Sequence, residues 1–348
     1  MSISLGQLLT SQNPLDFKNF FLCRKHTRLE GLIVEFETEQ TLMKGFIKNK
    51  WRIIDALVLR GIVKGERNSH FIILPRNKSR ETLDDIIALG SELKKTKQQV
   101  RSLKVTEKGV YLRNIEGEED IELIPDPQNN KSMTEDNRVL AMFWGFAIHT
   151  PKKFCEFARD ILLKDCFIQP YFNAGLWDLD KFLISPGRSR IIYIETKHKY
   201  PFKRKNGDLN FGMNKGEVET LNLLKKTDIS CWHTILLKPQ WEKDISSTYL
   251  FYNREAREKT LWLAADMKSD DFIVNSQKKP FIASKETSIN NSSSLKYFEL
   301  NSSSFYVVGK NSLTSEELSE NFYNIICNPA GKYQKVTKQC LLDNRISK

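Results

Sequence analysis

The segment Arg190–Phe202, with the sequence RIIYIETKHKYPF, constrains the fold more than any other stretch of the chain. The apolar run from Ile191 to Ile194 predicts a strand that is covered on both faces. Side chains alternate along a strand, so Glu195 and Lys197 should project from one face and Thr196 from the other. The segment therefore predicts a buried strand that ends in two neighbouring charges, which form either an ion pair at a strand end or the edge of an active site.

Length and charge limit the class of protein. The chain has 348 residues, more than one hydrophobic core usually serves, so we expect two domains or one domain with large additions. Its 54 Lys and Arg residues exceed its 43 Asp and Glu residues, giving a net charge of +11. This excess favours an anionic partner such as nucleic acid or an acidic membrane surface.

The cysteines and the N-terminus indicate the compartment. Six cysteines are scattered without CxxC spacing, which signals neither a zinc site nor a disulfide framework and indicates reduced thiols. The start MSISLGQLLT lacks the basic and apolar regions of a signal peptide. No apolar stretch reaches the roughly 18 residues that span a bilayer. We therefore expect a cytoplasmic protein without a membrane contact.

The first part of the chain predicts a mixed α/β domain over residues 1–128. Residues 29–42 are expected to form a strand, and Trp51, Ile54, Leu57 and Val58 stand at helical spacing within residues 47–63. A strand and turn over residues 64–75 would follow, and a helix before a basic hairpin is typical of a winged helix that binds nucleic acid or a partner, although other mixed folds give the same order. The polar segment 125–137 has the turn residues of a linker.

The second half alternates helices and strands. Helices are expected over residues 135–149, 151–166 and 214–226, and strands over residues 176–185, 191–197 and 231–239. This order predicts an α/β or α+β core in which helices flank a central mixed sheet, over residues 129–245. A hairpin at 247–267, further strands and a helix at 314–327 predict a C-terminal β-rich extension that ends in a helix, over residues 246–348.

Two aspartates precede the charged strand end. Asp178 and Asp180 share one face of the expected strand 176–185, and the turn at Pro186 and Gly187 folds this strand back toward Glu195 and Lys197. Mg²⁺ prefers oxygen ligands, and phosphodiester cleavage by metal ions needs carboxylates to hold the ion and a group that orients or polarises the attacking water. The hairpin can supply both.

On these residues the sequence resembles the PD-(D/E)xK nuclease superfamily, which has the restriction-endonuclease-like fold. The likeness covers roughly residues 150–240: Asp180 or Asp178, then Glu195-Thr196-Lys197 after a hairpin, then a helix and a strand. No proline precedes the aspartate, which leaves the choice between Asp178 and Asp180 open.

The resemblance implies a role for each matching residue. The aspartate and Glu195 would bind the metal, the Thr196 carbonyl could add a ligand, and Lys197 would assist the nucleophilic water. The family often adds a glutamate from an upstream helix, for which Glu156 is the best match and Glu135 the second.

A second E-x-K, at Glu92 and Lys94, lies in a segment of helical periodicity, where residues two apart point about 200° away from each other. Strand context therefore keeps only the pair at Glu195 and Lys197. The alternative for this pair is a solvated ion pair, worth little to stability.

The loop after the motif is basic and aromatic. It carries Lys199, Tyr200, Lys203, Arg204 and Lys205. Cations neutralise phosphates and aromatic rings stack on unpaired bases, so we expect these residues to bind nucleic acid. A merely solvated loop has the same composition.

The sequence thus favours a Mg²⁺-dependent endonuclease, with Mn²⁺ able to replace Mg²⁺ and DNA preferred to RNA by family habit. One alternative is a non-catalytic nucleic-acid-binding or protein-interaction module on the same fold. Another is a bacterial effector that acts on a host protein after delivery to the host cell. A homodimer or a partner protein is compatible with all three.

Overall fold

The computed structural model describes residues 4–77, 79–106, 109–114, 121–124, 136–173, 176–204, 207–242, 245–274, 280–282, 296–328 and 331–346. The chain forms two compact units, each made of two separate segments. The first unit combines Met1–Leu29 with Ile54–Asp180, and the second combines Glu30–Ile53 with Lys181–Lys348. We expected three consecutive domains at 1–128, 129–245 and 246–348. The chain instead crosses from one unit to the other three times, after residues 29, 53 and 180.

The structure is mixed α/β, with mixed sheets flanked by helices, as the sequence indicated in coarse terms. The α-helices are α1 (Leu5–Thr10), α2 (Lys18–Leu22), α3 (His26–Leu42), α4 (Lys44–Lys48), α5 (Arg80–Lys94), α6 (Asn137–His149), α7 (Pro151–Leu162), α8 (Lys215–Leu224), α9 (Tyr249–Tyr252), α10 (Arg254–Glu258), α11 (Ser315–Cys327) and α12 (Lys338–Asp343). No helix in the described ranges is both long and apolar enough to cross a membrane.

The strands are β1 (Arg52–Ile53), β2 (Ala56–Ile62), β3 (Ser69–Pro75), β4 (Gln99–Thr106), β5 (Gly109–Asn114), β6 (Ile121–Leu123), β7 (Trp177–Leu179), β8 (Lys181–Ile184), β9 (Ile191–Lys199), β10 (Phe202–Lys203), β11 (Leu209–Asn214), β12 (Ser230–Leu237), β13 (Leu261–Asp266), β14 (Phe281–Ile282), β15 (Lys296–Asn301) and β16 (Tyr306–Lys310).

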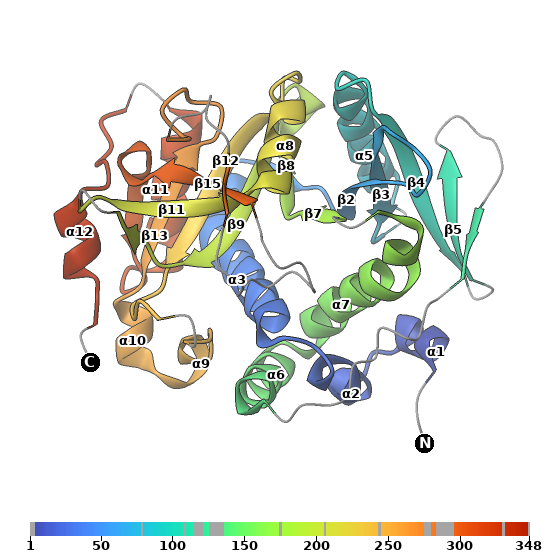
Figure 1. Ribbon diagram of the computed structural model, residues 1–348, viewed down its shortest axis with the longest axis horizontal. Helices are drawn as coiled ribbons and strands as arrows, with labels where there is room; N and C mark the ends of the chain where they lie inside the picture. The colour runs from blue at the N-terminus through green and yellow to red at the C-terminus, as the bar shows by residue number, and fades with distance from the viewer. Residues whose placement is uncertain are drawn as a thin grey trace. The chain divides into compact units, whose positions relative to one another are not determined.

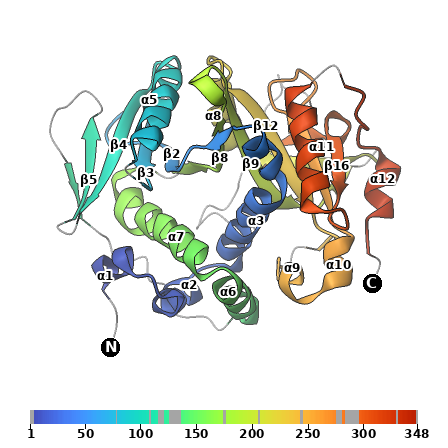
Figure 2. The ribbon, with the colours of Figure 1, turned by 180° about the vertical axis from the view of Figure 1, so that it is seen from behind.

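The second unit is built on a six-stranded sheet in the order β1-β8-β9-β12-β13-β16 (Figure 1). β9 and β12 are parallel, and α8 makes the crossover between them, whereas the other neighbours are antiparallel. β9 and β12 are apolar over most of their length because both faces of these central strands are buried. On the far side of this unit, α11 packs against β16 (Figure 2).

The second unit also has a smaller sheet in the order β10-β11-β15-β14. Its strands β10 and β11 lie between β9 and α8 along the chain, whereas β14 and β15 follow β13. Its β11 alternates buried apolar residues with polar ones, so Leu209, Phe211 and Met213 face the core. The hairpin β10–β11 contains most of the basic loop predicted to bind nucleic acid.

The first unit has its own six-stranded sheet, in the order β6-β5-β4-β3-β2-β7. β3 and β4 are parallel, α5 connects them and packs against both, and the other neighbours are antiparallel (Figure 1). α6 and α7 form as the sequence predicted, and Pro151 begins α7 at a position where its missing N–H costs nothing.

Two expectations for the N-terminal part were wrong in element type. Residues 29–42 lie in a helix, and residues 47–63, expected to form a helix, contain β1 and β2 after the short α4. β2 is buried on both faces, so its continuous apolar run carries no period of two, and the helical spacing seen there is incidental. The helix on which the winged-helix interpretation depended is replaced by strands.

The C-terminal part is less separate than expected. Residues 247–267, expected to be a hairpin, form α9, α10 and β13. β13 and β16 complete the sheet that contains β9, rather than forming an extension of their own.

A buried polar cluster joins α3 to β9. The Nδ1 atom of His198 lies 2.6 Å from Glu30, and its Nε2 atom lies 2.6 Å from the Tyr249 hydroxyl. The Lys238 ammonium lies 2.5 Å from the same Glu30 oxygen. Burial raises the pKa of Glu30, but His198 and Lys238 outweigh it and lower this pKa from 4.5 to about 2. The cluster thus holds a buried carboxylate in its ionised form.

We expect the stability of the protein to fall between about pH 4.5 and pH 2 because of Glu30. A carboxyl whose pKa is lower in the folded state stabilises that state above its unfolded pKa, and loses this contribution as the pH falls through the folded value. The shift corresponds to about 3 kcal/mol. Urea unfolding across this pH range should show a shallower pH dependence for Glu30→Gln than for the native chain. The exposed Glu255→Gln variant is the control, and an unchanged slope in Glu30→Gln would contradict the assignment.

Candidate functional site

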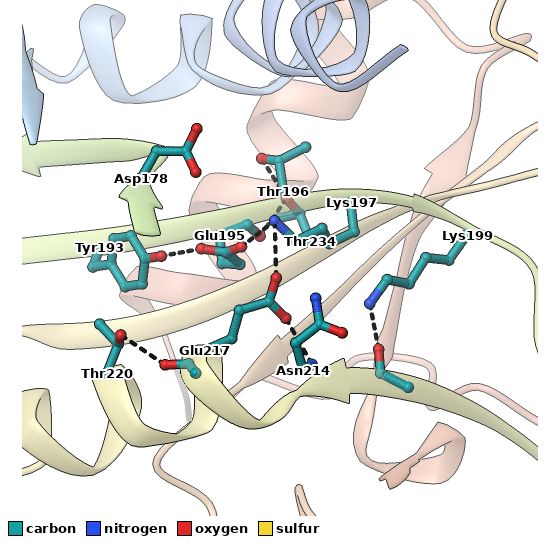
Figure 3. A network of polar contacts seen from close by, with 12 residues as sticks. Asp178, Tyr193, Glu195, Thr196, Lys197, Lys199, Asn214, Glu217, Thr220 and Thr234 are labelled. Carbon is teal, nitrogen blue, oxygen red and sulfur yellow. Dashed lines mark hydrogen bonds and ion pairs between the residues drawn. The ribbon is translucent and has the colours of Figure 1, made fainter. Parts of the chain in front are cut away.

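β9 presents Glu195 and Lys197 on the same face, as the alternation along the strand predicted (Figure 3). The two side chains form an ion pair. The Glu195 side chain is only 4% exposed, whereas that of Lys197 is 26% exposed. The pair is therefore a buried carboxylate beneath a partly accessible ammonium, and not the solvated strand-end ion pair that was the alternative.

Tyr193 lies two residues earlier on the same face of β9, and its hydroxyl donates a hydrogen bond to Glu195. Tyr193 is itself buried. The Glu195 carboxylate is thus held on one side by a phenol and on the other by an ammonium. Burying an unpaired carboxylate costs several kcal/mol of stability, and these two contacts offset that cost.

Glu217, at the start of α8, is the second carboxylate that reaches Lys197 (Figure 3). Its Oε1 atom lies 3.5 Å from the Lys197 ammonium, and its Oε2 atom accepts the backbone N–H of Asn214 at 3.0 Å. The second contact is half of a capping box. The sequence did not lead us to Glu217 as a site residue. The signal that could have found it is Asn214, three residues earlier, because Asn followed by Glu at this spacing is typical of a helix start.

The opposite face of β9 carries Thr196 and His198. The Thr196 hydroxyl lies 3.0 Å from that of Thr234, which also donates to the Glu195 carbonyl at 3.2 Å. The ladder between β8 and β9 ends at Lys181 and Ile194, so the described part of β9 beyond Ile194 pairs with β12 alone.

The expected single strand 176–185 is two strands in two sheets. Asp178 lies on β7, which pairs with β2 in the first unit, whereas β8 pairs with β9 in the second. The Asp178 carboxylate lies 2.7 Å from the ammonium of Lys164, a buried residue of the same unit. Asp180 is the last residue of the first unit and directly precedes Lys181, the first residue of β8. The two aspartates thus do not share one strand face.

The upstream glutamates also belong to the first unit or lie outside the described residues. Glu156 is on α7, where it pairs with Lys153 at 3.1 Å. Glu135 is not among the described residues. In the second unit, the helices that precede β1, β8 and β9 along the chain are α3 and the short α4.

The residues that were expected to bind nucleic acid differ in their exposure and in their partners. Lys199 donates to the Gly212 carbonyl, and burial lowers the pKa of its ammonium, so Lys199 links β9 to β11 instead of facing a phosphate. Arg204 pairs with Glu299 at 2.9 Å. Lys203 is exposed and Tyr200 is partly exposed, and Lys205 lies outside the described residues.

His233 lies in the core beside Glu195 in the register of β9 and β12. Its ring packs against Phe272 and Phe305, and within the described residues neither ring nitrogen has a hydrogen-bond partner. Burial, followed by the charges of Lys199 and Lys197, lowers its pKa well below the usual value. His233 is therefore a neutral core residue.

The oxygen atoms of Glu195 and Glu217 are the kind of ligand that Mg²⁺ prefers. Among the described residues, however, no group of three or more His, Cys, Asp or Glu side chains converges as a metal site. The second unit provides a buried carboxylate and a partly accessible lysine on one face of β9. No family model matches the chain, and no curated protein or solved structure matches it either.

Because Glu195 is buried, loss of its cation should be costly. We expect Lys197→Ala to destabilise the protein by about 2 kcal/mol, a value reduced from that of a fully buried pair because Lys197 is partly exposed. The double variant Glu195→Gln/Lys197→Ala should recover part of this loss, since the buried charge of Glu195 is then absent, while Glu217 still lacks its cation. Denaturant unfolding of the four proteins of the cycle measures both effects.

The exposed pair of Lys259 and Glu255, whose atoms lie 3.0 Å apart, is the control. Lys259→Ala should change stability little. A loss in Lys197→Ala no larger than that in Lys259→Ala would show that Glu195 is not held by Lys197.

Proposed function

We propose that the protein is a metal-dependent nuclease that hydrolyses phosphodiester bonds, with DNA preferred to RNA. The observation that carries the proposal is the pair of Glu195 and Lys197 on one face of β9. A buried carboxylate paired with a partly accessible ammonium is common at functional sites.

The order of elements supports a restriction-endonuclease-like core in the second unit. The resemblance requires a hairpin, then the strand with E-x-K, then a helix and a further strand. β8, β9, α8 and β12 follow in this order, and β12 is parallel to β9.

Asp180 is the aspartate that we assign to the site. Lys181 is paired with Ile194, the residue before Glu195, so Asp180 precedes the ladder at the same end at which Glu195 follows it. Asp178, by contrast, already neutralises the buried Lys164. The structure thus supports a site role for Asp180 and a structural role for Asp178.

Each residue of the proposed site has a stated task. Asp180 and Glu195 would hold Mg²⁺ or Mn²⁺, which lowers the pKa of bound water and neutralises charge on the phosphate. Lys197 would stabilise the negative charge that develops on the attacking oxygen and on the phosphate. Tyr193 and Glu217 would position Glu195 and Lys197, since each contacts one of them.

The hairpin β10–β11 supplies the proposed contact with nucleic acid. The rings of Phe202 and Tyr297 meet edge to face with centroids 6.1 Å apart, next to Gly212, which has no side chain to cover them. Both rings are partly exposed, as is usual for aromatic residues that stack on bases, and Lys203 lies beside Phe202.

Metal-dependent cleavage should require Glu195 and Asp180 but not Asp178. With Mg²⁺ or Mn²⁺ and plasmid, single-stranded DNA and RNA as substrates, Glu195→Gln and Asp180→Asn should cut at least about 100-fold more slowly than the native chain. Calorimetric titration should show weakened Mn²⁺ binding in the same two variants. Asp178→Asn is the matched control, and its effect should be on stability.

If Asp178→Asn abolished Mn²⁺ binding while Asp180→Asn did not, the assignment would be reversed. Binding to nucleic acid with no cleavage under any metal condition would favour the non-catalytic module. An absence of both would favour the effector.

Binding to nucleic acid should depend steeply on salt because cations of the hairpin release counterions from phosphates. The triple variant Lys203→Ala/Arg204→Ala/Lys205→Ala should bind an oligonucleotide more weakly and reduce the slope of log K against log salt by about two, since Arg204 is already paired with Glu299. Fluorescence anisotropy in the presence of a chelator measures the slope. Replacing the exposed lysines 64, 94 and 95 by alanine is the control, and equal slopes for both triple variants would rule out the hairpin as the contact.

A further inference from the structure

The small sheet of the second unit has one apolar face, which packs on the core, and one mixed face. Phe202 pairs with Asn210 between β10 and β11. Gly212 pairs with Glu299 between β11 and β15. Paired residues point to the same side of a sheet, and so do residues two apart on one strand. The mixed face is made of six residues: Phe202, Arg204, Asn210, Gly212, Tyr297 and Glu299.

The aromatic half of the mixed face lies over Gly212. A Cβ atom at this position would lie 3.5 Å from the Tyr297 ring and 3.9 Å from the Phe202 ring. The two rings meet edge to face, with an angle of 86° between their planes, and both are partly exposed. Sheet faces with accessible aromatic rings of this kind hold unpaired bases in proteins that bind RNA or single-stranded DNA.

The polar half of the mixed face fixes an arginine. The Nε atom of Arg204 lies 2.9 Å from Glu299 Oε2, and the Asn210 side-chain amide donates to the same oxygen at 3.3 Å. The Glu299 side chain is 6% exposed, whereas that of Arg204 is 29% exposed. Within the described residues, no partner of the Arg204 Nη1 and Nη2 atoms is found. Because a buried acid already neutralises its charge, Arg204 offers a ligand oriented donors more than it offers charge.

The two halves are close enough to hold one ligand. Burial raises the pKa of the Tyr297 phenol, the charge of Glu299 raises it further, and that of Arg204 lowers it. The phenol therefore lies within electrostatic reach of both charges. Phe202 and Arg204 are two residues apart, which is about 7 Å along an extended chain. One planar group can thus touch a ring and the guanidinium together.

The width of the sheet decides what kind of nucleic acid this face can meet. Four strands cover three spacings of about 4.8 Å, or about 14 Å in all, whereas the major groove of a duplex is about 12 Å wide. The face as a whole is therefore too wide to enter the groove. A base that it contacts must lie outside a double helix.

We propose that the mixed face holds one unpaired guanine of a nucleic-acid strand, which stacks on the rings of Phe202 and Tyr297 and accepts two hydrogen bonds from Arg204. Guanine presents two acceptors, O6 and N7, on the same edge, and arginine is the side chain that most often pairs with both. Glu299 and Asn210 keep the guanidinium in place for this contact.

β11 connects the guanine site to the proposed reactive centre (Figure 3). It ends at Asn214, two residues after Gly212, and the Asn214 backbone N–H binds Glu217. Glu217 in turn contacts Lys197, and Lys199 donates to the Gly212 carbonyl. The inference rests on the proposed function in taking the partner to be nucleic acid, and it adds that the cut lies near an unpaired guanine.

The first test measures binding in the presence of a chelator, so it does not need activity. The probe is a fluorescent oligothymidine strand with one central guanine. The native chain should bind it about tenfold more tightly than strands in which 7-deazaguanine, which lacks N7, or 2-aminopurine, which lacks O6, replaces the guanine. Inosine keeps both acceptors and should bind as guanine does. Equal affinity for all four strands would overturn the inference.

The second test identifies the reading residue. Arg204→Lys keeps a cation beside the buried Glu299 but cannot donate two parallel hydrogen bonds, so the preference for guanine over 7-deazaguanine should disappear. Arg257→Lys is the matched control, because Arg257 pairs with another buried glutamate of the same unit, Glu37, at 3.2 Å. A preference that survives in Arg204→Lys, or that is lost equally in Arg257→Lys, would overturn the assignment.

The third test concerns stacking and the unpaired state. Phe202→Leu should weaken the binding of every strand about tenfold and keep the preference, and unchanged affinity would show that the base does not stack there. Annealing the strand to its complement should abolish the preference. A preference that persists in the duplex would overturn the unpaired state, and GMP that binds as tightly as the strand would overturn the strand as the source of the guanine.

The outcomes separate this inference from the proposed function. Cleavage without any preference for guanine would overturn the inference alone. A preference for guanine without cleavage under any metal condition would overturn the nuclease and leave the guanine site. An absence of binding to every strand would overturn both.

Discussion

The parallel ladder between β9 and β12 is the interaction on which the second unit depends. It pairs residues from Ser230 with Ile192 to Leu237 with Lys199, and α8 closes the crossover. Strands covered on both faces leave little solvent for polar side chains, so the charges on β9 beyond Ile194 are paired with groups of neighbouring elements. Glu30 and Lys238 serve one face, and Glu217 and the Gly212 carbonyl serve the other.

Short-range pattern predicted the centre of the second unit well. The apolar run before Glu195, the helix 214–226 and the strand 231–239 correspond closely to β9, α8 and β12, because each combines a clear period or run with a definite start and end. The shared face of Glu195 and Lys197 followed from strand alternation alone. Burial of Glu195 did not follow, since it depends on Tyr193 and on the covering layer.

Secondary structure was predicted wrongly where a buried strand or helix lacks a clear hydrophobic period. Strand pairing was predicted wrongly where the two paired strands lie far apart in sequence. In α3, Glu30, Glu37 and Glu39 are charged residues on inward positions, paired with His198, Arg257 and Lys181, so the helix lacks a clean apolar stripe. The spacing of Asp178 and Asp180 is that of two residues on one face of a strand. However, β7 pairs with β2, where Asp178 lies opposite Leu59, a residue far earlier in the chain. Nothing local reports such a pairing.

The pairing of β1 with β8 bears on how the chain acquires its structure. Arg52 pairs with Ile184, and the whole of residues 54–180 separates them. Contacts between residues far apart in sequence slow folding because the loop must close before the contact stabilises anything. During synthesis, α3 and β1 emerge early and must wait for β8 and β9, with their apolar surfaces unmatched in the meantime. The acids of α3 have no partners while that helix waits, and we expect their charges to limit its association with other chains.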